Sequence, residues 1–250
     1  MPLMCRRKRG AKAPTASFKK RTDGKEIKGM EKKVININEP VENLVVQAQQ
    51  TVCLHKVGFL GPLHVRVETG GRLEACFFQT GQACDISVDL AGKEASCDIK
   101  AVYLVRKKEE NILNIKVRHS VPFTFSHQMI RGILTQEGQG VFNGLVRMQA
   151  GAQKSEGDQS HKALLLSDKA RVRGQPELEI FADDVKCSHG NAIGSLDDEK
   201  LFYLRTRGFN EAAAQKLLIR AFAAQAVLPE WESLLDEWLA EIEIGSLSVK

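Results

Sequence analysis

The chain has 250 residues, of which 43% are hydrophobic and 27% are charged, and its formal net charge is +5. These proportions are close to those of ordinary globular domains, so they exclude a wholly disordered chain and a membrane-embedded one. Only 6% of the residues are aromatic, which predicts a core of aliphatic side chains and alanine. The length suits one large domain, or one domain with a small appendage.

The positive charge is concentrated at the N-terminus. Residues 1–33 carry twelve Lys and Arg residues against three acidic ones, a local charge of +9, whereas residues 34–250 sum to −4. We therefore expect a basic, disordered tail over residues 1–33, with an organelle transit peptide as the open alternative. A nucleic-acid partner is disfavoured because Phe18 is the only aromatic side chain in the tail that could stack on bases.

The sequence carries no signal for secretion or for membrane insertion. No apolar segment follows the basic start, and no run approaches the roughly 18–20 apolar residues of a membrane-spanning helix. The six cysteines form no CxxC pair, which favours free thiols in a reducing compartment. We predict a cytoplasmic protein without a membrane partner.

Residues 34–194 read as short strands. Apolar residues alternate with polar ones, as in Ile86-x-Val88 and Ile115-x-Val117, and this period of two is typical of strands. A shift of 21 residues aligns VRVETGGRLEAC (65–76) with ISVDLAGKEASC (86–97). The pattern predicts a β-solenoid whose stacked coils bury a narrow apolar column. Chance similarity between two strand-turn-strand units is the alternative.

The pattern changes to helices in residues 195–250, for which we expect a small C-terminal helical domain. Ser195 and Asp198 have the spacing of a capping box, and Gly208 suits the end of that first helix. Asn210 is expected to cap the next helix. A third segment places Trp231, Leu234, Leu235, Trp238, Leu239 and Ile242 on one helical stripe.

Cys187 and His189 form a CxH pair in the segment VKCSHG. On an extended strand both side chains would leave the same face about 7 Å apart, a spacing at which they could share a soft metal or cluster. The spacing alone is a weak signal, because a buried cysteine beside a histidine in a turn gives the same pattern.

The surrounding sequence resembles the SufB/SufD family of iron–sulfur cluster assembly proteins. The resemblance is carried by residues 176–225, which begin PELEIFADDVKCSHG, by 142–172 and by 118–134. It implies a right-handed parallel β-helix followed by C-terminal helices. In that family, SufB and SufD pair through their β-helices, the ATPase SufC docks on the C-terminal helices, and nascent clusters are thought to assemble where SufB and SufD pair.

The signature is SufD-like, because SufD carries KCSHG where SufB carries EHEAT. By this resemblance His189 is the histidine implicated in the cluster site, and Cys187 is the adjacent interface thiol. His161 in SHKAL occupies the position of the SufB scaffold cysteine. We consider it a possible nitrogen ligand, with a solvated turn residue as the alternative. Any iron–sulfur cluster is expected to be transient at a subunit interface, with no stably bound cofactor.

The sequence also departs from the family pattern. Asn191 and Ala192 stand where the family usually has Ala-Thr. SufD proteins are considerably longer, and we expect their N-terminal helical domain to be missing here, because strand-like sequence already begins at Val34. The solenoid is therefore expected to be short.

Three functions follow from these observations. The first is a non-catalytic SufD-like subunit that pairs with SufB and docks SufC through its helices, with Arg205, Arg207, Leu217, Leu218 and Phe222 as candidate contacts. The second is a minimal homodimeric scaffold that itself holds a nascent cluster. The third is an enzyme using Asp183 and Asp184, disfavoured because neighbouring strand residues point to opposite faces. No GxxxxGK[ST] loop is present, so ATP hydrolysis would belong to a partner.

Overall fold

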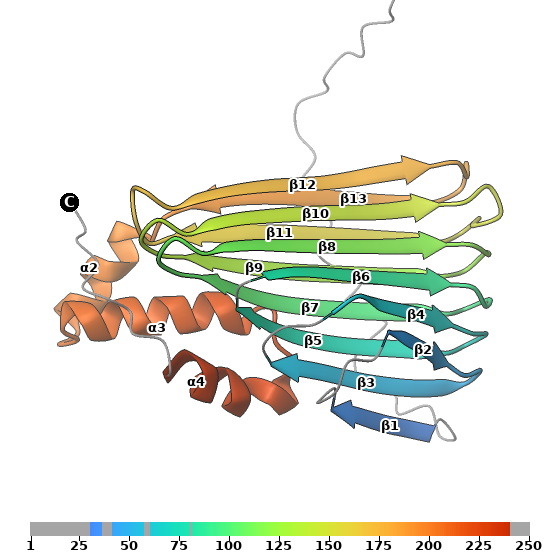
Figure 1. Cartoon of the computed structure of the whole chain (residues 1–250), viewed down its shortest axis with the longest axis horizontal. Coiled ribbons are helices and arrows are strands. Elements are labelled where there is room, and N and C mark those ends of the chain that lie inside the picture. Colours follow the sequence, from blue (N-terminus) through green and yellow to red (C-terminus); the bar gives the residue numbers. More distant parts are fainter. Residues whose placement is uncertain (1–30, 37–41, 58–60, 81, 241–250) are drawn as a thin grey trace, which may run out of the picture. The chain divides into compact units, whose positions relative to one another are not determined.

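The computed structural model describes residues 31–36, 42–57, 61–80 and 82–240. Most of the expected basic tail lies outside these residues, as does Ile242. Strands occupy the described chain up to Gly194, and helices follow (Figure 1). The elements are β1 (Glu31–Asn36), β2 (Asn43–Val46), β3 (Gln50–Val57), β4 (Leu63–Val67), β5 (Arg72–Thr80), β6 (Gln82–Leu90), β7 (Ser96–Val105), β8 (Glu110–His119), β9 (Phe125–Leu134), β10 (Gln139–Met148), β11 (Glu156–Leu165), β12 (Arg171–Ile180), β13 (Lys186–Gly194), α2 (Asp198–Thr206), α3 (Glu211–Ala224), η1 (Pro229–Trp231) and α4 (Glu232–Ala240).

The strands alternate between two parallel sheets, which confirms the predicted parallel β-helix. The odd sheet has the order β1-β3-β5-β7-β9-β11-β13, and the even sheet has the order β12-β10-β8-β6-β4-β2. Each strand pairs in parallel with the strand two positions away in the chain. The chain therefore passes through one strand of each sheet in every coil, and successive coils stack (Figure 1).

The coil length differs from the 21-residue repeat that the sequence suggested. The proposed alignment of residues 65–76 with 86–97 is wrong, because Val65 pairs with Val88 and Leu73 pairs with Cys97. A 21-residue spacing occurs one coil earlier, where Thr51 pairs with Arg72. Later coils are longer mainly because their strands are longer, as β7 and β8 show beside β3 and β4. Strand alternation alone could not reveal this, because slips of two residues preserve the inward face.

Tight corners between the even and odd strands stack on one another. Several corner residues adopt the left-handed region, including Gln49 at φ 57° and Glu94 at φ 62°. The corners are joined by backbone hydrogen bonds, such as Gln49 N to Thr69 O at 3.0 Å. At Gly92 a Cβ atom would lie 1.9 Å from the backbone N of Thr69. Only glycine permits this approach between successive corners.

The interior between the two sheets is a narrow column of side chains. Alternate residues of each strand point inward, as in β4, where Leu63, Val65 and Val67 are buried and the intervening residues are exposed. Aliphatic side chains and small cysteines such as Cys84 and Cys97 fill the first coils. Packed sheets lie about 10 Å apart, and aliphatic side chains fill this distance.

The helices cover part of the outer face of the odd sheet. Ile219 and Ala223 of α3 and Trp238 of α4 share a hydrophobic cluster with residues of β5, β7 and β9, and the Phe78 and Trp238 ring centroids are 5.6 Å apart. The predicted cap at Asn210 is confirmed, since its side chain accepts a hydrogen bond from Ala213 N at 2.8 Å. Ser195, which the sequence suggested as the N-cap of the first helix, does not cap it.

Asp197 caps α2 instead, because its carboxylate accepts from Lys200 N at 3.2 Å. Gly208 follows the end of α2 at φ 93°, as predicted for a helix C-terminus. Within the part of the chain that the structure describes, no helix is long and apolar enough to cross a membrane.

Candidate functional site

The residues that the sequence singled out lie on β13, the last strand of the odd sheet. In the described structure β13 pairs with β11, so Cys187 lies opposite Gly157 and His189 lies opposite Gln159. Cys187, His189 and Asn191 alternate along β13 and share the face that continues the interior column. The sequence prediction that Cys187 and His189 share one face of a strand is therefore confirmed. We call β12 and β13 the terminal coil.

Cys187 is half-buried and packs against the small apolar cluster of Val146, Met148 and Ala152. Burial raises the pKa of its thiol, and a hydrogen bond with the Gly157 backbone partly opposes this shift. The thiol is consequently protonated at neutral pH. Binding of a soft metal at Cys187 would release this proton, because the thiolate is the metal ligand.

His189 is exposed and lies one coil above a pair of buried glutamines. Gln159 Nε2 donates to Gln128 Oε1 at 2.8 Å, and both side chains are almost fully buried. Gln159 Oε1 and Gln128 Nε2 have no hydrogen-bond partner among the described residues. Sequence analysis missed these glutamines. Their only signal was an amide at an inward strand position, which is costly unless it is satisfied.

His161 lies in the interior and not in a turn, so the alternative interpretation of a solvated turn residue is wrong. It is fully buried on β11. Its Nε2 is 2.8 Å from the Tyr103 hydroxyl and its Nδ1 is 2.8 Å from Asn191 Oδ1. Burial lowers the pKa of His161 to about 4. The ring is neutral, and both ring nitrogens are engaged in hydrogen bonds within the protein.

The three candidate ligands are therefore not brought to one exposed point. Cys187 and His189 share the open face of the terminal coil, whereas His161 lies one coil below, opposite Asn191. Among the described residues, no group of three or more His, Cys, Asp or Glu side chains is placed to hold a metal ion. Asp183 and Asp184 lie in the turn before β13, and Asp184 pairs with Lys154 at 2.6 Å.

The second candidate surface lies on α2 and α3. Arg205 and Arg207 are at the end of α2, and the Arg207 guanidinium lies 5.2 Å from the Tyr203 ring. Leu217 is 40% exposed, but Leu218 is half-buried. Phe222 is also half-buried, and it packs against the cluster beneath α3.

Sequence analysis missed the most exposed aromatic side chains of this region. Phe202 is 70% exposed, Tyr203 is 57% exposed and Phe209 is 44% exposed. Their signal was the run LFYLRTRGF, in which the first helix carries more large apolar residues than its single buried position, Leu201, requires. We define Phe202, Tyr203, Arg205, Arg207, Phe209 and Leu217 as the helical surface.

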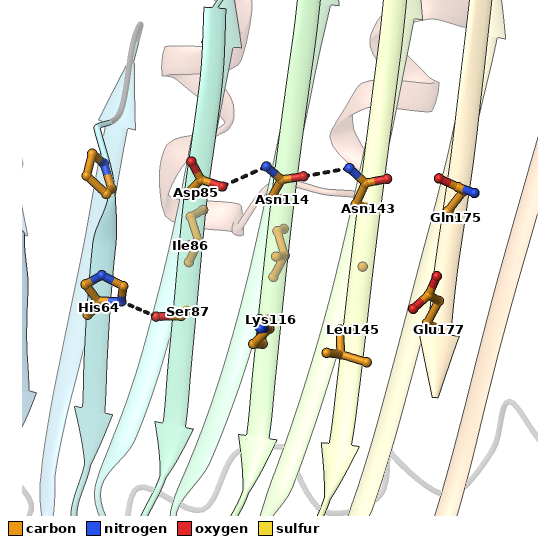
Figure 2. A pocket seen from close by; sticks show the side chains of 13 residues that line it. His64, Asp85, Ile86, Ser87, Asn114, Lys116, Asn143, Leu145, Gln175 and Glu177 are labelled. Carbon is orange, nitrogen blue, oxygen red and sulfur yellow. Dashed lines mark hydrogen bonds between the residues drawn. The ribbon is translucent and has the colours of Figure 1, made fainter. Parts of the chain in front are cut away.

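A third feature is a groove of about 580 Å³ on the outer face of the even sheet. Figure 2 shows its lining, in which polar side chains form rows across successive strands. Asn143 donates to Asn114 at 2.7 Å, and Asn114 donates to Asp85 at 2.7 Å. Such ladders of side-chain hydrogen bonds connect stacked strands. None of these residues was singled out from the sequence.

Residues 54–222 match the family described as "SUF system FeS cluster assembly, SufBD core domain". The chain is 39% identical to the iron–sulfur cluster assembly protein SufD of Escherichia coli (strain K12) over 155 residues, which are 62% of this chain and 36% of that protein. It is 43% identical over 104 residues to an iron–sulfur cluster assembly SufBD family protein of Synechocystis, covering 42% of this chain and 23% of the relative.

A chloroplastic protein of Arabidopsis thaliana, ABCI7, is 33% identical over 164 residues, covering 65% of this chain and 33% of the relative. The chain thus spans about a third or less of the length of these curated relatives. The matched family segment includes the β-helix from β3 onward and extends into α3. The fold and the sequence agree, and the chain belongs to the SufB/SufD family of iron–sulfur cluster assembly proteins.

Proposed function

We propose that this chain acts as a SufD-like, non-catalytic scaffold subunit in SUF iron–sulfur cluster assembly. Family membership supports the general role. The observation that carries the specific role is the terminal coil, where Cys187 and His189 share the uncovered face of an edge strand. An edge strand offers unpaired backbone groups to another chain, so the residues for cluster chemistry and the surface for subunit pairing coincide.

The terminal coil has the properties of a pairing surface. Among the described strands, β12 pairs with β10 and β13 pairs with β11. Large apolar side chains are exposed beside these edges, including Ile180 at 46%, Phe181 at 57% and Ile193 at 46%. Burial of such side chains drives association, and backbone pairing of two edges gives it direction. We propose a SufB-type β-helix as the occupant.

The cargo at this interface is a nascent iron–sulfur cluster. Each iron in such a cluster is held by thiolates, or by imidazoles in some cases. Cys187 supplies a soft sulfur ligand and His189 an imidazole, and the paired subunit supplies the others. The cluster is transient because it is passed on, so no stably bound cofactor is part of the proposal. A cytoplasmic location also remains part of it, and cell fractionation tests this against a plastid location.

The helical surface is the proposed docking site for the SufC-type ATPase. Exposed aromatic side chains flanked by Arg205 and Arg207 suit a partner groove that is apolar with an acidic rim. The helix α3 is firmly held, because Arg131 of β9 donates to Gln225 Oε1 at 3.1 Å and lies 5.7 Å from the Phe222 ring. Phe222 and Leu218 therefore contribute to the packing of α3, and Leu217 contributes to docking.

Co-purification with a SufC-type ATPase and a SufB-type partner tests the proposal. Deletion of 195–250 is a poor probe, because it would uncover the apolar residues beneath α3 and α4. We propose the variants Phe202→Ser and Arg205→Glu instead, with Lys216→Glu on α3 as the matched surface control. We expect the first two to lose the ATPase and the control to retain it. Unchanged co-purification in all three variants would contradict the docking assignment.

A homodimeric scaffold is the second candidate, favoured because the free edges of the terminal coil could pair with a second copy. Two copies bring two Cys187 thiolates and two His189 imidazoles to one interface. Anaerobic reconstitution with iron and sulfide tests this hypothesis by absorption spectroscopy. We expect a visible cluster that is lost in Cys187→Ala and kept in Cys84→Ala, whose thiol is buried in the interior. A protein that stays colourless excludes this candidate.

A further inference from the structure

A chain of hydrogen bonds runs through the interior of the β-helix and ends on β13. It connects Tyr103 of β7, His161 of β11, Asn191 of β13 and the backbone of Gly174 in β12. The Tyr103 hydroxyl lies 2.8 Å from His161 Nε2, and His161 Nδ1 lies 2.8 Å from Asn191 Oδ1. Asn191 Nδ2 donates to Gly174 O at 3.0 Å. We call these four residues the interior hydrogen-bond network.

The directions of these hydrogen bonds are mutually consistent. Because the Asn191 amide nitrogen donates to Gly174, its Oδ1 faces His161 and accepts. His161 must therefore carry its proton on Nδ1, and its Nε2 accepts from the Tyr103 hydroxyl. Burial keeps the ring neutral, with a pKa of about 4, and it raises the pKa of the Tyr103 hydroxyl, which remains a donor.

Two glycines of the surrounding backbone leave room for the interior hydrogen-bond network. A Cβ atom at Gly174 would lie 2.6 Å from Asn191 Oδ1 and 2.7 Å from His161 Nδ1. A Cβ atom at Gly132 would lie 2.3 Å from Tyr103 Cζ. Phe142 stacks on the His161 ring with centroids 4.6 Å apart. Packing as well as hydrogen bonding therefore restricts the rings of Tyr103 and His161.

Two further side-chain interactions of β13 lie on its outer face. Ser188 donates to Asp158, and Lys186 pairs with Glu156 at 3.3 Å, although the lysine side chain is 79% exposed. Exposed ion pairs contribute little to stability. The Asn191 side chain differs from these, because it bonds directly to Gly174 of β12 in the even sheet and also to the buried imidazole of His161 in β11.

We propose that His161 is a positioning residue, which holds Asn191 and thereby fixes the strand that carries Cys187 and His189. Asn191 lies two residues from His189 and four from Cys187 on the same strand face. The inference assigns His161 a role other than iron ligation. Its importance for cluster assembly rests on the proposed function, but the positioning itself does not.

Amide hydrogen exchange on the full chain, read by peptide mass spectrometry, tests the proposal. His161→Phe keeps the stacked ring and removes both hydrogen bonds of the imidazole. Asn191→Ala removes the hydrogen bonds of the exposed Asn191 side chain to His161 and Gly174. We expect exchange in residues 186–194 to become about tenfold faster in both variants, because loss of one or two hydrogen bonds favours local opening. Cys187 should react correspondingly faster with a thiol reagent.

Matched controls separate positioning from general destabilisation. His119→Phe removes another buried histidine, whose hydrogen-bond partners Thr124 and Ser126, at 2.8 Å each, lie outside β13. Asn143→Ala removes an asparagine of the even-sheet ladder. Neither should loosen residues 186–194 selectively. His161→Gln should partly restore protection, since its amide can both donate to Asn191 and accept from Tyr103.

Two outcomes would overturn the proposal: wild-type protection of residues 186–194 in Asn191→Ala, or equal loosening of β9 and β13 in all variants. Asn191 is exposed, so its variant remains informative if His161→Phe does not fold. Partner co-purification is measured on the same proteins. If the unaltered chain captures no SufB-type or SufC-type partner, the proposed function fails, while the exchange data still decide the role of His161.

Discussion

The first and last coils of this β-helix use the same backbone but have different interiors. One inward column passes through Leu54, Ala75 and Ile99 in β3, β5 and β7, and then through Gln128 and Gln159. It ends at His189 of β13. A neighbouring column changes in the same way. It contains Phe77, Ala101, Ile130, His161 and Asn191.

The apolar interior of the first coils contributes stability, whereas the polar interior of the later coils fixes the positions of the strands. Apolar contacts are non-directional, so the first coils tolerate repeats of unequal length while they bury the same residue types. Hydrogen bonds depend steeply on distance and angle, so a polar interior is satisfied in only one register. Gln79 is a polar residue of the early coils, and it lies in register with Tyr103, where the polar region begins.

The largest effect that we predict from the polar interior of the later coils is a loss of folding stability on acidification. Burial lowers the pKa of His119 to about 3 and that of His161 to about 4, whereas an unfolded histidine has a pKa near 6.5. The unfolded chain therefore binds more protons below pH 6.5, so stability is complete above that pH and is lost towards pH 4. We expect each histidine to account for about 3 kcal/mol of this loss by pH 4.

Urea unfolding at pH 7, 6, 5 and 4 measures this loss as a decrease in the free energy of unfolding. In His161→Phe the pH-dependent loss of unfolding free energy should be smaller by the contribution of one histidine, while the contributions of the carboxylates remain. An identical pH dependence in the variant and the unaltered chain would show that His161 is not buried as a neutral ring.

The next effect concerns the apolar coils. Ile99→Ala removes a fully buried side chain and should lower the free energy of unfolding by about 3 kcal/mol, since both transfer free energy and packing are lost. Ile99→Val serves as the control and should cost about 1 kcal/mol. Urea denaturation measures both values. Equal losses in the two variants would contradict a tightly packed interior at this position.

At the glutamine pair we expect a smaller loss of stability from a single substitution, and no loss from the double substitution. Gln159→Met alone leaves Gln128 Oε1 without its donor and should cost about 1–2 kcal/mol. The double variant Gln128→Met with Gln159→Met also removes the two unpartnered atoms, so it should be as stable as the unaltered chain or more stable. Thermal unfolding of the single and double variants provides the measurement. Additive losses would show that the pair stabilises the fold.

The smallest effect belongs to the outer ladder of the even sheet. Asn143→Ala removes one hydrogen bond to Asn114 and should cost about 0.5 kcal/mol, because water replaces much of the interaction at this partly exposed site. Urea denaturation of Asn143→Ala against the unaltered chain measures the difference. A loss as large as that of Ile99→Ala would mean that the ladder, and not the interior, holds the coils together.

The strand content and inward faces of the β-helix could be predicted from alternation, since successive strand residues point to opposite sides. The helix boundaries at Gly208 and Asn210 were equally local, because caps depend on a few neighbouring residues. The coil lengths could not be predicted in this way. Pairing depends on where the chain turns, and the strands of this protein as well as its corners vary in length.

The same division applies to the candidate site. The CxH spacing in VKCSHG implied that Cys187 and His189 share one face if the segment is a strand, since side chains alternate along a strand. Only the tertiary structure decided that His161 is a buried hydrogen-bond partner of Tyr103 and Asn191. That assignment depends on contacts between residues 30 and 58 positions apart in the chain, and no local pattern encodes which side chains will meet there.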